Sequence, residues 1–190
     1  KKPLIFTNND SGYETAIEFK KNGVDPIILD TRKEPKSEII DEAKKLDIQI
    51  KFSYVVVAAK GYKKVKSAEV AKISDDKNEL GTLENINCDC ICVSGFWTPT
   101  IHLASQSGNK TTFNKDIDAF VPGLSKQNET TLGAANGTFT LEETLKNSFE
   151  SGYQISKKIT NNDNKTSSPT VMEKKSTTHD KFWCVPLPKG

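Results

Sequence analysis

The sequence predicts a mixed α/β fold in which a parallel sheet is followed by a β-meander. Over residues 3–52, short apolar runs alternate with amphipathic, helix-like segments. Such alternation is typical of parallel strands joined by helical crossovers. Residues 54–73 change this pattern, because strand-like runs are joined there by a short turn that contains Gly61. A glycine turn between two such runs indicates an antiparallel hairpin.

Apolar spacing and capping residues place the elements of the first series. In the first predicted helix Ala16, Ile17 and Phe19 share a face, and Gly23 follows as a C-cap. The second predicted helix has Ile39 and Ala43 on one face. The predicted elements are strands 3–7, 26–30 and 48–52 and helices 11–22 and 38–46.

The rest of the chain is predicted as a meander, two further strands and a long helix. The predicted strands are 54–59, 64–73, 89–93 and 131–135, with a loop region up to residue 123 between the last two, and the predicted helix is 140–158. Cys88, Cys90 and Cys92 alternate along one strand, and no second cysteine pair could complete a zinc tetrahedron. We therefore expect buried structural thiols and no metal site.

Three regions follow from these elements. Residues 1–83 are predicted to form a first lobe with the β-hairpin, residues 84–159 the returning part of a second lobe, and residues 160–190 a linker and an extended C-terminal segment. Residues 160–180 offer almost no apolar surface to bury, whereas residues 182–188 are apolar and are expected to dock in extended form. Neither end looks like a natural terminus, so we interpret the chain as an excised segment.

Composition excludes several classes of function. The 27 Lys and Arg residues nearly balance the 25 Asp and Glu residues, which does not favour a nucleic-acid or membrane-surface partner. No apolar run approaches the roughly 18 residues that cross a bilayer, and no secretory signal is evident. We expect a cytoplasmic location.

A first motif lies where a dinucleotide-binding unit carries Gly-x-Gly-x-x-Gly. Residues 7–13 read TNNDSGY, so only Gly12 is present of the glycines that let a backbone approach a pyrophosphate. The acidic residue expected at the end of the second strand is present as Asp30. We favour a Rossmann-like unit that has lost its nucleotide over one that still binds it.

A second motif runs from residue 131 into the long helix. Small residues at a junction between a strand and a helix can expose backbone N–H groups to an anion, which makes residues 133–139 a candidate nucleotide site. Close packing of the strand against the helix is the alternative explanation.

Taken together, several segments resemble the alpha subunit of heterotetrameric sarcosine oxidase over about residues 3–158. These segments are 7–13 (TNNDSGY), 28–32 (ILDTR), 88–103 (CDCICVSGFWTPTIHL), 105–110 (SQSGNK) and 133–139 (GAANGTF). The resemblance implies a reductase-like fold: a Rossmann-like three-layer lobe with parallel sheet and β-meander, plus the C-terminal part of a second dinucleotide-binding lobe.

By the same resemblance, Gly133, Ala134, Gly137, Thr138 and Phe139 border an NAD site in the full-length subunit. In related flavoproteins an aspartate that helps to hold flavin stands where this chain has Ala134. The Gly-rich loop that forms the other half of the site is not in this chain. We expect Gly137→Val to weaken NAD binding with little loss of stability.

The family implies a function in which this segment is one part. FAD in the beta subunit, FMN near the alpha–beta contact and tetrahydrofolate in a domain not present here carry the chemistry, and the partners are the beta, gamma and delta subunits. The segment is expected to contribute scaffold and part of an NAD site to oxidative demethylation of sarcosine to glycine, with H2O2 and methylene-folate formation. By itself it is expected to be inactive, with no catalytic residue, and His102 is interpreted as structural or interfacial.

Two alternatives stay open. The chain could be a reductase-like subunit of another amine or opine oxidase, or a structural module that binds no nucleotide.

Overall fold

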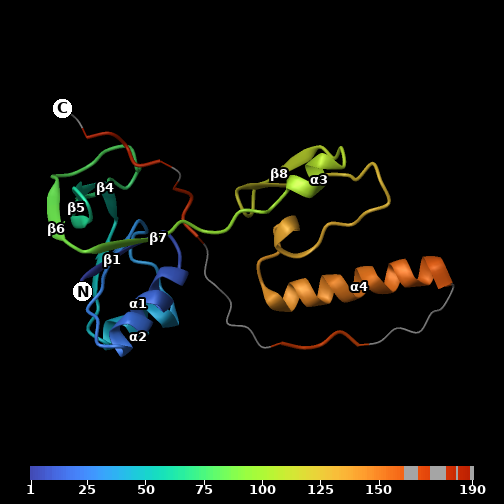
Figure 1. Ribbon diagram of the computed structural model, residues 1–190, viewed down its shortest axis with the longest axis horizontal. Helices are drawn as coiled ribbons and strands as arrows, with labels where there is room; N and C mark the ends of the chain where they lie inside the picture. Colours follow the sequence, from blue (N-terminus) through green and yellow to red (C-terminus); the bar gives the residue numbers. More distant parts are fainter. Residues whose placement is uncertain (161–166, 172–178, 183, 189–190) are drawn as a thin grey trace. The chain divides into compact units, whose positions relative to one another are not determined.

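A computed structural model describes residues 1–160, 167–171, 179–182 and 184–188. The chain divides into two compact units (Figure 1), of which unit 1 comprises residues 1–96 and 176–190 and unit 2 comprises residues 97–175. Unit 1 therefore contains both of the segments that come before and after unit 2 along the chain. The assignment of residues 84–159 to the returning part of a second lobe remains a prediction.

Unit 1 is built on a four-stranded parallel sheet with the order β3-β2-β1-β7. Its strands are β1 (Pro3–Thr7), β2 (Ile27–Asp30), β3 (Gln49–Phe52) and β7 (Cys90–Ser94). The crossover helices α1 (Ser11–Lys21) and α2 (Glu38–Lys45) lie between the first three strands. The predicted β-α-β-α-β series is thus confirmed, with ends that shift by at most about two residues, as is usual for such boundaries.

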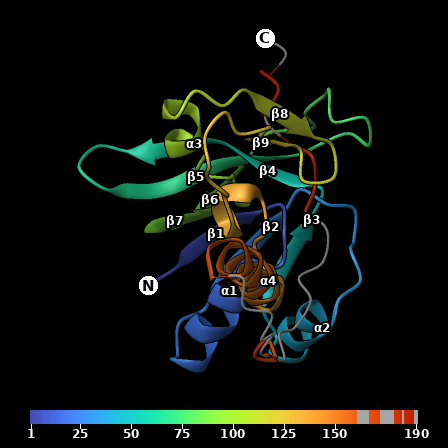
Figure 2. The same cartoon turned by 90° about the vertical axis from the view of Figure 1, so that its right-hand side faces the viewer.

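The parallel sheet is buried on both faces, because side chains alternate across a strand. Ile5 and Ile28 pack against the helices, while Leu4 and Leu29 pack against a second, antiparallel sheet. That sheet consists of β4 (Tyr54–Gly61), β5 (Val65–Lys72) and β6 (Glu84–Asn87). Figure 2 shows the resulting three layers, with the parallel sheet between α1 and α2 on one side and the antiparallel sheet on the other.

The order of the strands creates a switch point beside β1. The chain moves outward from β1 to β2 and β3, passes through the antiparallel sheet, and returns as β7 on the opposite side of β1. In open parallel sheets ligands bind outside the carboxyl ends of the strands at such a point. The candidate site of unit 1 therefore lies at the ends of β1 and β7.

The cysteines follow the predicted strand only in part. Cys88 is buried, but Cys90 is exposed and Cys92 is half-buried, so the prediction of buried thiols is wrong for Cys90. The reason is that β7 is an edge strand and only Cys92 on its helix-facing side reaches the core cluster. Within the part of the chain that the structure describes, no group of three or more metal-ligating side chains is found.

Unit 2 differs from the prediction more than unit 1. The expected loop region contains a short helix α3 (His102–Gln106) and a hairpin of β8 (Thr111–Asn114) and β9 (Ala119–Pro122). The expected strand 131–135 is wrong, because the structure has a 3-10 helix η1 (Gly133–Asn136) there. Gly133 and Gly137 have φ angles of 65° and 79°, a left-handed conformation that closes a turn and that an extended strand cannot contain.

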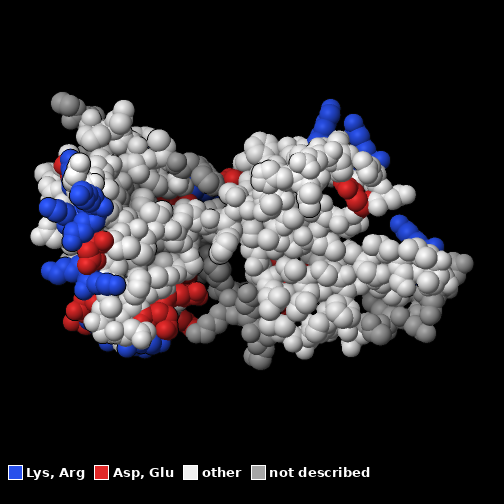
Figure 3. All heavy atoms as spheres, viewed as in Figure 1, with Lys and Arg blue, Asp and Glu red and all other residues white. Residues whose placement is uncertain are grey.

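The long helix α4 (Leu141–Thr160) is confirmed, but none of its residues is buried. Leu141, Phe149, Ile155 and Ile159 on its apolar face are each at least 40% exposed. Figure 3 shows few charged side chains on the face of α4 that it presents. The helix is amphipathic, and within unit 2 no described layer covers its apolar face. No described helix is both long enough and apolar enough to span a membrane.

A pair of valines tests the contact between the two sheets of unit 1. Val70 on β5 is fully buried against the parallel sheet, whereas Val93 on β7 is 70% exposed. We expect Val70→Ala to lower the free energy of unfolding by about 2 kcal/mol, since it removes two buried methyl groups and leaves a cavity. Val93→Ala should change it by less than about 0.5 kcal/mol. Urea unfolding of both variants measures this, and equal losses would contradict the described packing.

Candidate functional site

The candidate site of unit 1 is the carboxyl edge of its parallel sheet, where three turns meet. The turn after β1 is Asn8–Asn9–Asp10, the turn after β2 contains Thr31 and Arg32, and Ser94 ends β7. The first two turns consist of polar side chains that are nonetheless buried. Buried polar groups need partners, and these partners determine whether a ligand has access.

Direct hydrogen bonds bridge the crevice between β1 and β7. The Asn9 side-chain amide donates to the Ser94 carbonyl oxygen at 3.1 Å, and the Asn8 N–H donates to the same oxygen at 3.4 Å. The hydroxyls of Ser11 and Ser94 lie 2.5 Å apart. These bonds join the ends of β1 and β7 at the edge where a dinucleotide-binding unit holds its pyrophosphate.

The N-terminus of α1 also has internal acceptors. The Ser11 N–H donates to Asn9 Oδ1 at 2.9 Å, and the Tyr13 N–H donates to the Asp10 carbonyl oxygen at 3.0 Å. Helix N-termini bind phosphate through N–H groups that lack such partners. Since Asn9 takes one of these N–H groups, the asparagine acts as a substitute for the anion.

Gly12 has a packing role that explains why it is the one glycine of the motif in this chain. A Cβ at this position would lie 2.7 Å from Thr7 Cβ, so any side chain would force α1 away from β1. Close packing of helix and strand is the role of the third glycine in the dinucleotide fingerprint. The packing role of the motif is thus present, while the phosphate role is absent.

Asp30 lies at the centre of a buried charge network. Its carboxylate is 0% exposed and accepts hydrogen bonds from the Tyr13 hydroxyl at 2.7 Å and from Arg32 Nη2 at 2.8 Å. Arg32 Nε and the Arg32 backbone N–H donate to the other oxygen at 3.0 and 2.9 Å. Arg32 Nη1 forms an ion pair with Asp10 Oδ1 at 2.9 Å. In a working site this acid would bind a ribose hydroxyl, but here protein donors occupy both of its oxygens.

The network shifts two pKa values upward. Burial and then the negative charge of Asp30 raise the pKa of Tyr13 far above its ordinary value. Burial alone would lower the pKa of Arg32, but the hydrogen bonds and charges of Asp30 and Asp10 outweigh it and raise that pKa. Both groups therefore keep their protons throughout the physiological range.

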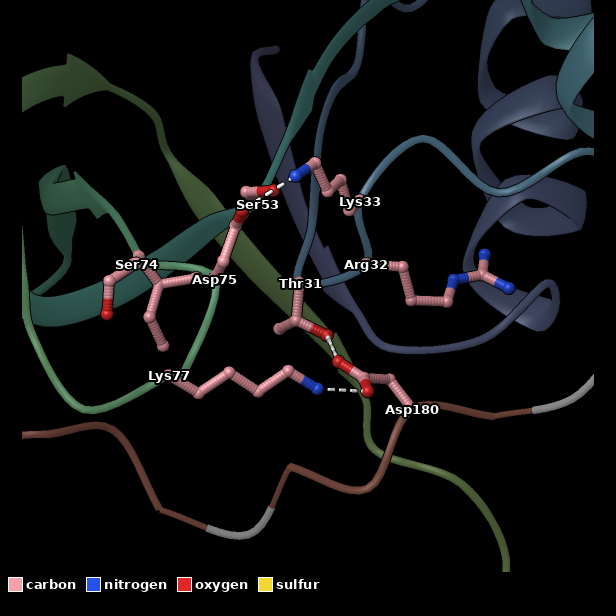
Figure 4. Close-up of a pocket in the computed structure, with 9 residues that line it drawn as sticks. Thr31, Arg32, Lys33, Ser53, Ser74, Asp75, Lys77 and Asp180 are labelled. Atoms are coloured by element: carbon pink, nitrogen blue, oxygen red, sulfur yellow. Dashed lines mark hydrogen bonds and ion pairs between the residues drawn. The ribbon is translucent and has the colours of Figure 1, made fainter.

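A pocket of about 360 Å³ opens beside this network. Lys33, Ser53, Asp75 and Lys77 contribute to its lining, together with Asp180 from the C-terminal segment, and Figure 4 shows how these side chains lie. Lys33 pairs with Asp75 at 2.6 Å, and Lys77 pairs with Asp180. Each of the two lysines in the pocket thus faces a carboxylate.

The residues expected to border NAD are brought together in unit 2 at the η1–α4 junction. Gly133 is buried, Ala134 is exposed, and Gly137, Thr138 and Phe139 are half-buried. Their backbone is partly used within the turn, since the Gly137 N–H donates to the Ala134 carbonyl at 3.2 Å and the Thr138 N–H to the Gly133 carbonyl at 3.1 Å.

The surroundings of Gly137 contradict the expectation that Gly137→Val would cause little loss of stability. Its φ is 79°, and a Cβ there would lie 2.5 Å from Ile117 Cδ1 and 3.1 Å from Val121 Cγ1. A valine would therefore be strained and would disturb the packing of unit 2. Ala134 is the better position for a test of nucleotide binding.

Other polar candidates lie apart from these sites or outside the description. His102 is exposed at the start of α3, and Trp97 is 65% exposed. The predicted linker 160–180 and Trp183 fall largely or wholly outside the described residues. His179 and Asp180 are described, and they contact unit 1 instead of lying in a loose linker.

Removal of the buried cation should show how much unit 1 depends on the network. We expect Arg32→Ala to cost about 3–5 kcal/mol of unfolding free energy, because it leaves the Asp30 carboxylate buried without its counter-ion. The neighbouring Lys33 pairs with Asp75 at the surface, so Lys33→Ala should cost less than about 1 kcal/mol of unfolding free energy. Chemical denaturation of both variants is the measurement, and a small loss for Arg32→Ala would contradict the network's role.

Tyr13 should make stability fall in alkali. Its pKa is raised in the folded state, so the unfolded chain loses this proton near pH 10 while the folded protein keeps it. The contribution is fully present below about pH 10 and falls by up to about 1.4 kcal/mol per pH unit above it. Tyr13→Phe should be less stable at pH 8 but should lose less stability between pH 10 and 11 than the parent chain. Parallel slopes in denaturation curves at these pH values would count against the prediction.

No family model matches the chain. Relatives are found among curated sarcosine oxidase alpha subunits. The chain is 33% identical over 144 residues to the subunit from Rhizobium meliloti (strain 1021), an alignment that covers 72% of this chain and 13% of the relative. It is 28% identical over 144 residues to the subunit from Corynebacterium sp. (strain P-1), covering 75% of this chain and 15% of the relative. The chain thus spans about a seventh of the length of these relatives.

Two solved structures share the fold. The bacillithiol disulfide reductase of Staphylococcus aureus has a TM-score of 0.53 at 15% identity, covering 73% of this chain and 47% of that one. The thioredoxin reductase of T. acidophilum has a TM-score of 0.52 at 16% identity, covering 73% and 48%. They confirm a reductase-like dinucleotide-binding fold. The resemblance that the motifs predict is confirmed as well: over about three quarters of its length, this chain is similar to a segment of the sarcosine oxidase alpha subunits.

Proposed function

We propose that this chain is a scaffold segment of the alpha subunit of a sarcosine-oxidase-type enzyme, in which unit 1 binds no dinucleotide. The observation that carries this proposal is the closed carboxyl edge of unit 1: Asn9 accepts from the N-terminus of α1 as a phosphate would, and Arg32 and Tyr13 donate to Asp30 as a ribose hydroxyl would. Sequence similarity to alpha subunits supports the assignment to this type of oxidoreductase. Unit 1 then stabilises the subunit without taking part in the chemistry.

Within this proposal the η1–α4 junction of unit 2 is one rim of an NAD site. Ala134 is exposed and Thr138 carries a hydroxyl three residues before α4 begins, which supports the proposal that both border a nucleotide held by a loop from elsewhere in the subunit. The chain's contribution is limited, because the N–H groups of Gly137 and Thr138 bond within the turn. At the start of α4 the Glu143 N–H donates to the Thr140 hydroxyl oxygen at 3.4 Å, and the Thr140 hydroxyl lies 3.0 Å from the Glu143 carboxylate, whose charge does not favour a phosphate.

The N–H groups of Gly137 and Thr138, which bond within the turn, favour one alternative: a structural module whose η1–α4 junction serves packing alone. The NAD-rim hypothesis predicts that changes at this junction affect NAD binding, whereas the structural-module hypothesis predicts that they do not. A third reading, a subunit of another amine or opine oxidase, shares this scaffold and differs in the substrate of its partners.

The apolar face of α4 supports a place inside a larger subunit. Phe149 and Ile159 are exposed on a helix that has no buried residue, and an exposed apolar face of this length commonly marks an interaction surface. We infer that this face packs against another part of the same subunit.

The whole enzyme's reaction follows as part of the same proposal. Sarcosine is demethylated oxidatively to glycine, with H2O2 and methylene-folate formation, in a cytoplasmic complex with beta, gamma and delta subunits. FAD, FMN and tetrahydrofolate supply the oxidation and one-carbon chemistry at sites outside this chain. No residue of this chain is assigned a catalytic role.

The substitution Ala134→Arg in the full-length subunit tests the NAD rim. Ala134 is exposed, so an arginine should fold without cost but should project into the space that a nucleotide needs. We expect the NAD content of the purified complex to fall at least tenfold. Asn147→Arg adds the same charge at an exposed position of α4 about two turns into the helix, and it should leave NAD content unchanged.

Calorimetric titration of this chain with NAD and with FAD, next to the full-length subunit, separates the readings. If the η1–α4 junction is one rim of an NAD site, this chain alone should not bind NAD and the full-length subunit should bind it. Binding by this chain alone would mean that the turn after β1 is a working site, which would refute the closed edge. Unchanged NAD content in both arginine variants would favour the structural module.

A further inference from the structure

A short C-terminal segment, His179–Asp180, lies against the carboxyl edge of unit 1, and we call it the strap. Its backbone is bound at the turn after β1: the Asp180 N–H donates to the Asn8 carbonyl oxygen at 2.9 Å, and the Asn8 side-chain amide donates to the Asp180 carbonyl oxygen at 3.0 Å. These two bonds join residues that are 172 positions apart in the sequence. The reciprocal pattern resembles one rung of a β-ladder and fixes the direction of the strap.

The Asp180 carboxylate is bound by two side chains of unit 1. The Thr31 hydroxyl donates to its Oδ2 at 3.0 Å, and the Lys77 ammonium pairs with its Oδ1. Figure 4 shows both side chains directed at Asp180, while Arg32 points away from it. The Asp180 side chain is only 16% exposed and that of Lys77 32%, so solvent screens this pair less than a surface salt bridge.

The His179 ring has a partner of its own. It stacks on the Phe96 ring with centroids 3.7 Å apart and an interplanar angle of 16°. Phe96 is the last residue of the first segment of unit 1, and His179 belongs to the second. The stack therefore joins the point at which the chain leaves unit 1 to the point at which it returns.

The other cations at this edge do not serve the strap. Lys33 pairs with Asp75, and Arg32 pairs with Asp30 and Asp10. Lys77 is thus the lysine that selects the Asp180 carboxylate, and Lys33 offers a matched control in the same pocket.

We propose that the carboxyl edge of unit 1 is a binding site for an aromatic–acidic dipeptide, and that its ligand is the chain's own strap. Phe96 recognises the ring, Thr31 and Lys77 recognise the carboxylate, and Asn8 recognises the backbone between them. The strap covers the place where such folds bind ligands, and the stack of His179 on Phe96 joins the two segments of unit 1. This inference concerns unit 1 and does not depend on an NAD rim in unit 2.

Hydrogen exchange of the Asp180 amide in the full chain is the first test. Asp180→Asn keeps the shape of the side chain but removes its charge, and Lys77→Met removes the cation. Each should speed exchange at position 180 about tenfold, the size expected for loss of one partly buried charge-assisted hydrogen bond. Lys33→Met should change the rate less than twofold. Equal effects of the two lysine variants, or no effect of Asp180→Asn, would overturn the proposal.

A peptide in trans provides the second measurement. A labelled peptide of residues 179–188 should bind the full-length double variant His179→Ala/Asp180→Ala, whose own strap is disabled, and should not bind the parent chain. Adding Lys77→Met to the double variant should abolish binding, as should an asparagine at the aspartate position of the peptide. Absence of binding to the double variant, or equal binding to the parent chain, would show that the edge is not a site for this segment.

Discussion

The buried carboxylate of Asp30 is the constraint on which the architecture of unit 1 depends. A fully buried charge is unfavourable unless ion pairs and hydrogen bonds compensate it, and Asp30 meets this condition with Arg32 and Tyr13. Arg32 follows two residues after Asp30, so the turn after β2 must fold back on the strand end. Tyr13 comes from α1, so the helix is held at a fixed rotation. Asp10, paired with Arg32, adds the turn after β1 to the same network.

This network explains how a dinucleotide fold can keep its shape without its ligand. In a binding unit, glycines leave N–H groups and space for a pyrophosphate, and the acid at the end of the second strand is open to a ribose. Here position 9 is asparagine instead of glycine, and protein donors surround Asp30. Both features leave less access for a nucleotide. The Asn9 side chain accepts from the Ser11 N–H at the N-terminus of α1 and donates to the Ser94 carbonyl oxygen, so these two groups are satisfied internally.

The sequence predicts this arrangement only where local pattern decides it. The alternation of apolar runs is enough for β1, α1, β2, α2 and β3, and the missing glycines together with Asp30 are enough to suspect a lost nucleotide site. Tyr13 and Ser94 are not predictable as partners of this site, since only the fold brings them to the strand ends. Asp180 is even less predictable as a partner of Asn8, because the two residues are 172 positions apart and Asp180 follows a low-complexity stretch.

The prediction for unit 2 fails for a different physical reason. Residues 131–135 have the small and apolar side chains of a short strand, but Gly133 and Gly137 permit left-handed backbone that an apolar pattern does not reveal. The predicted thiol burial at Cys90 fails because periodicity gives the face of a strand but not whether that strand lies at an edge.

The two units differ in how completely their own residues cover their apolar faces and bind their polar groups. In unit 1 the parallel sheet is covered on both faces, and its ligand edge is filled by internal side chains and by the strap. In unit 2 the apolar face of α4 is exposed although the helix is well capped at its start. Within unit 2, no described layer covers that face. The cofactor contribution that we propose for this chain is therefore assigned to unit 2, and the role that we propose for unit 1 is support.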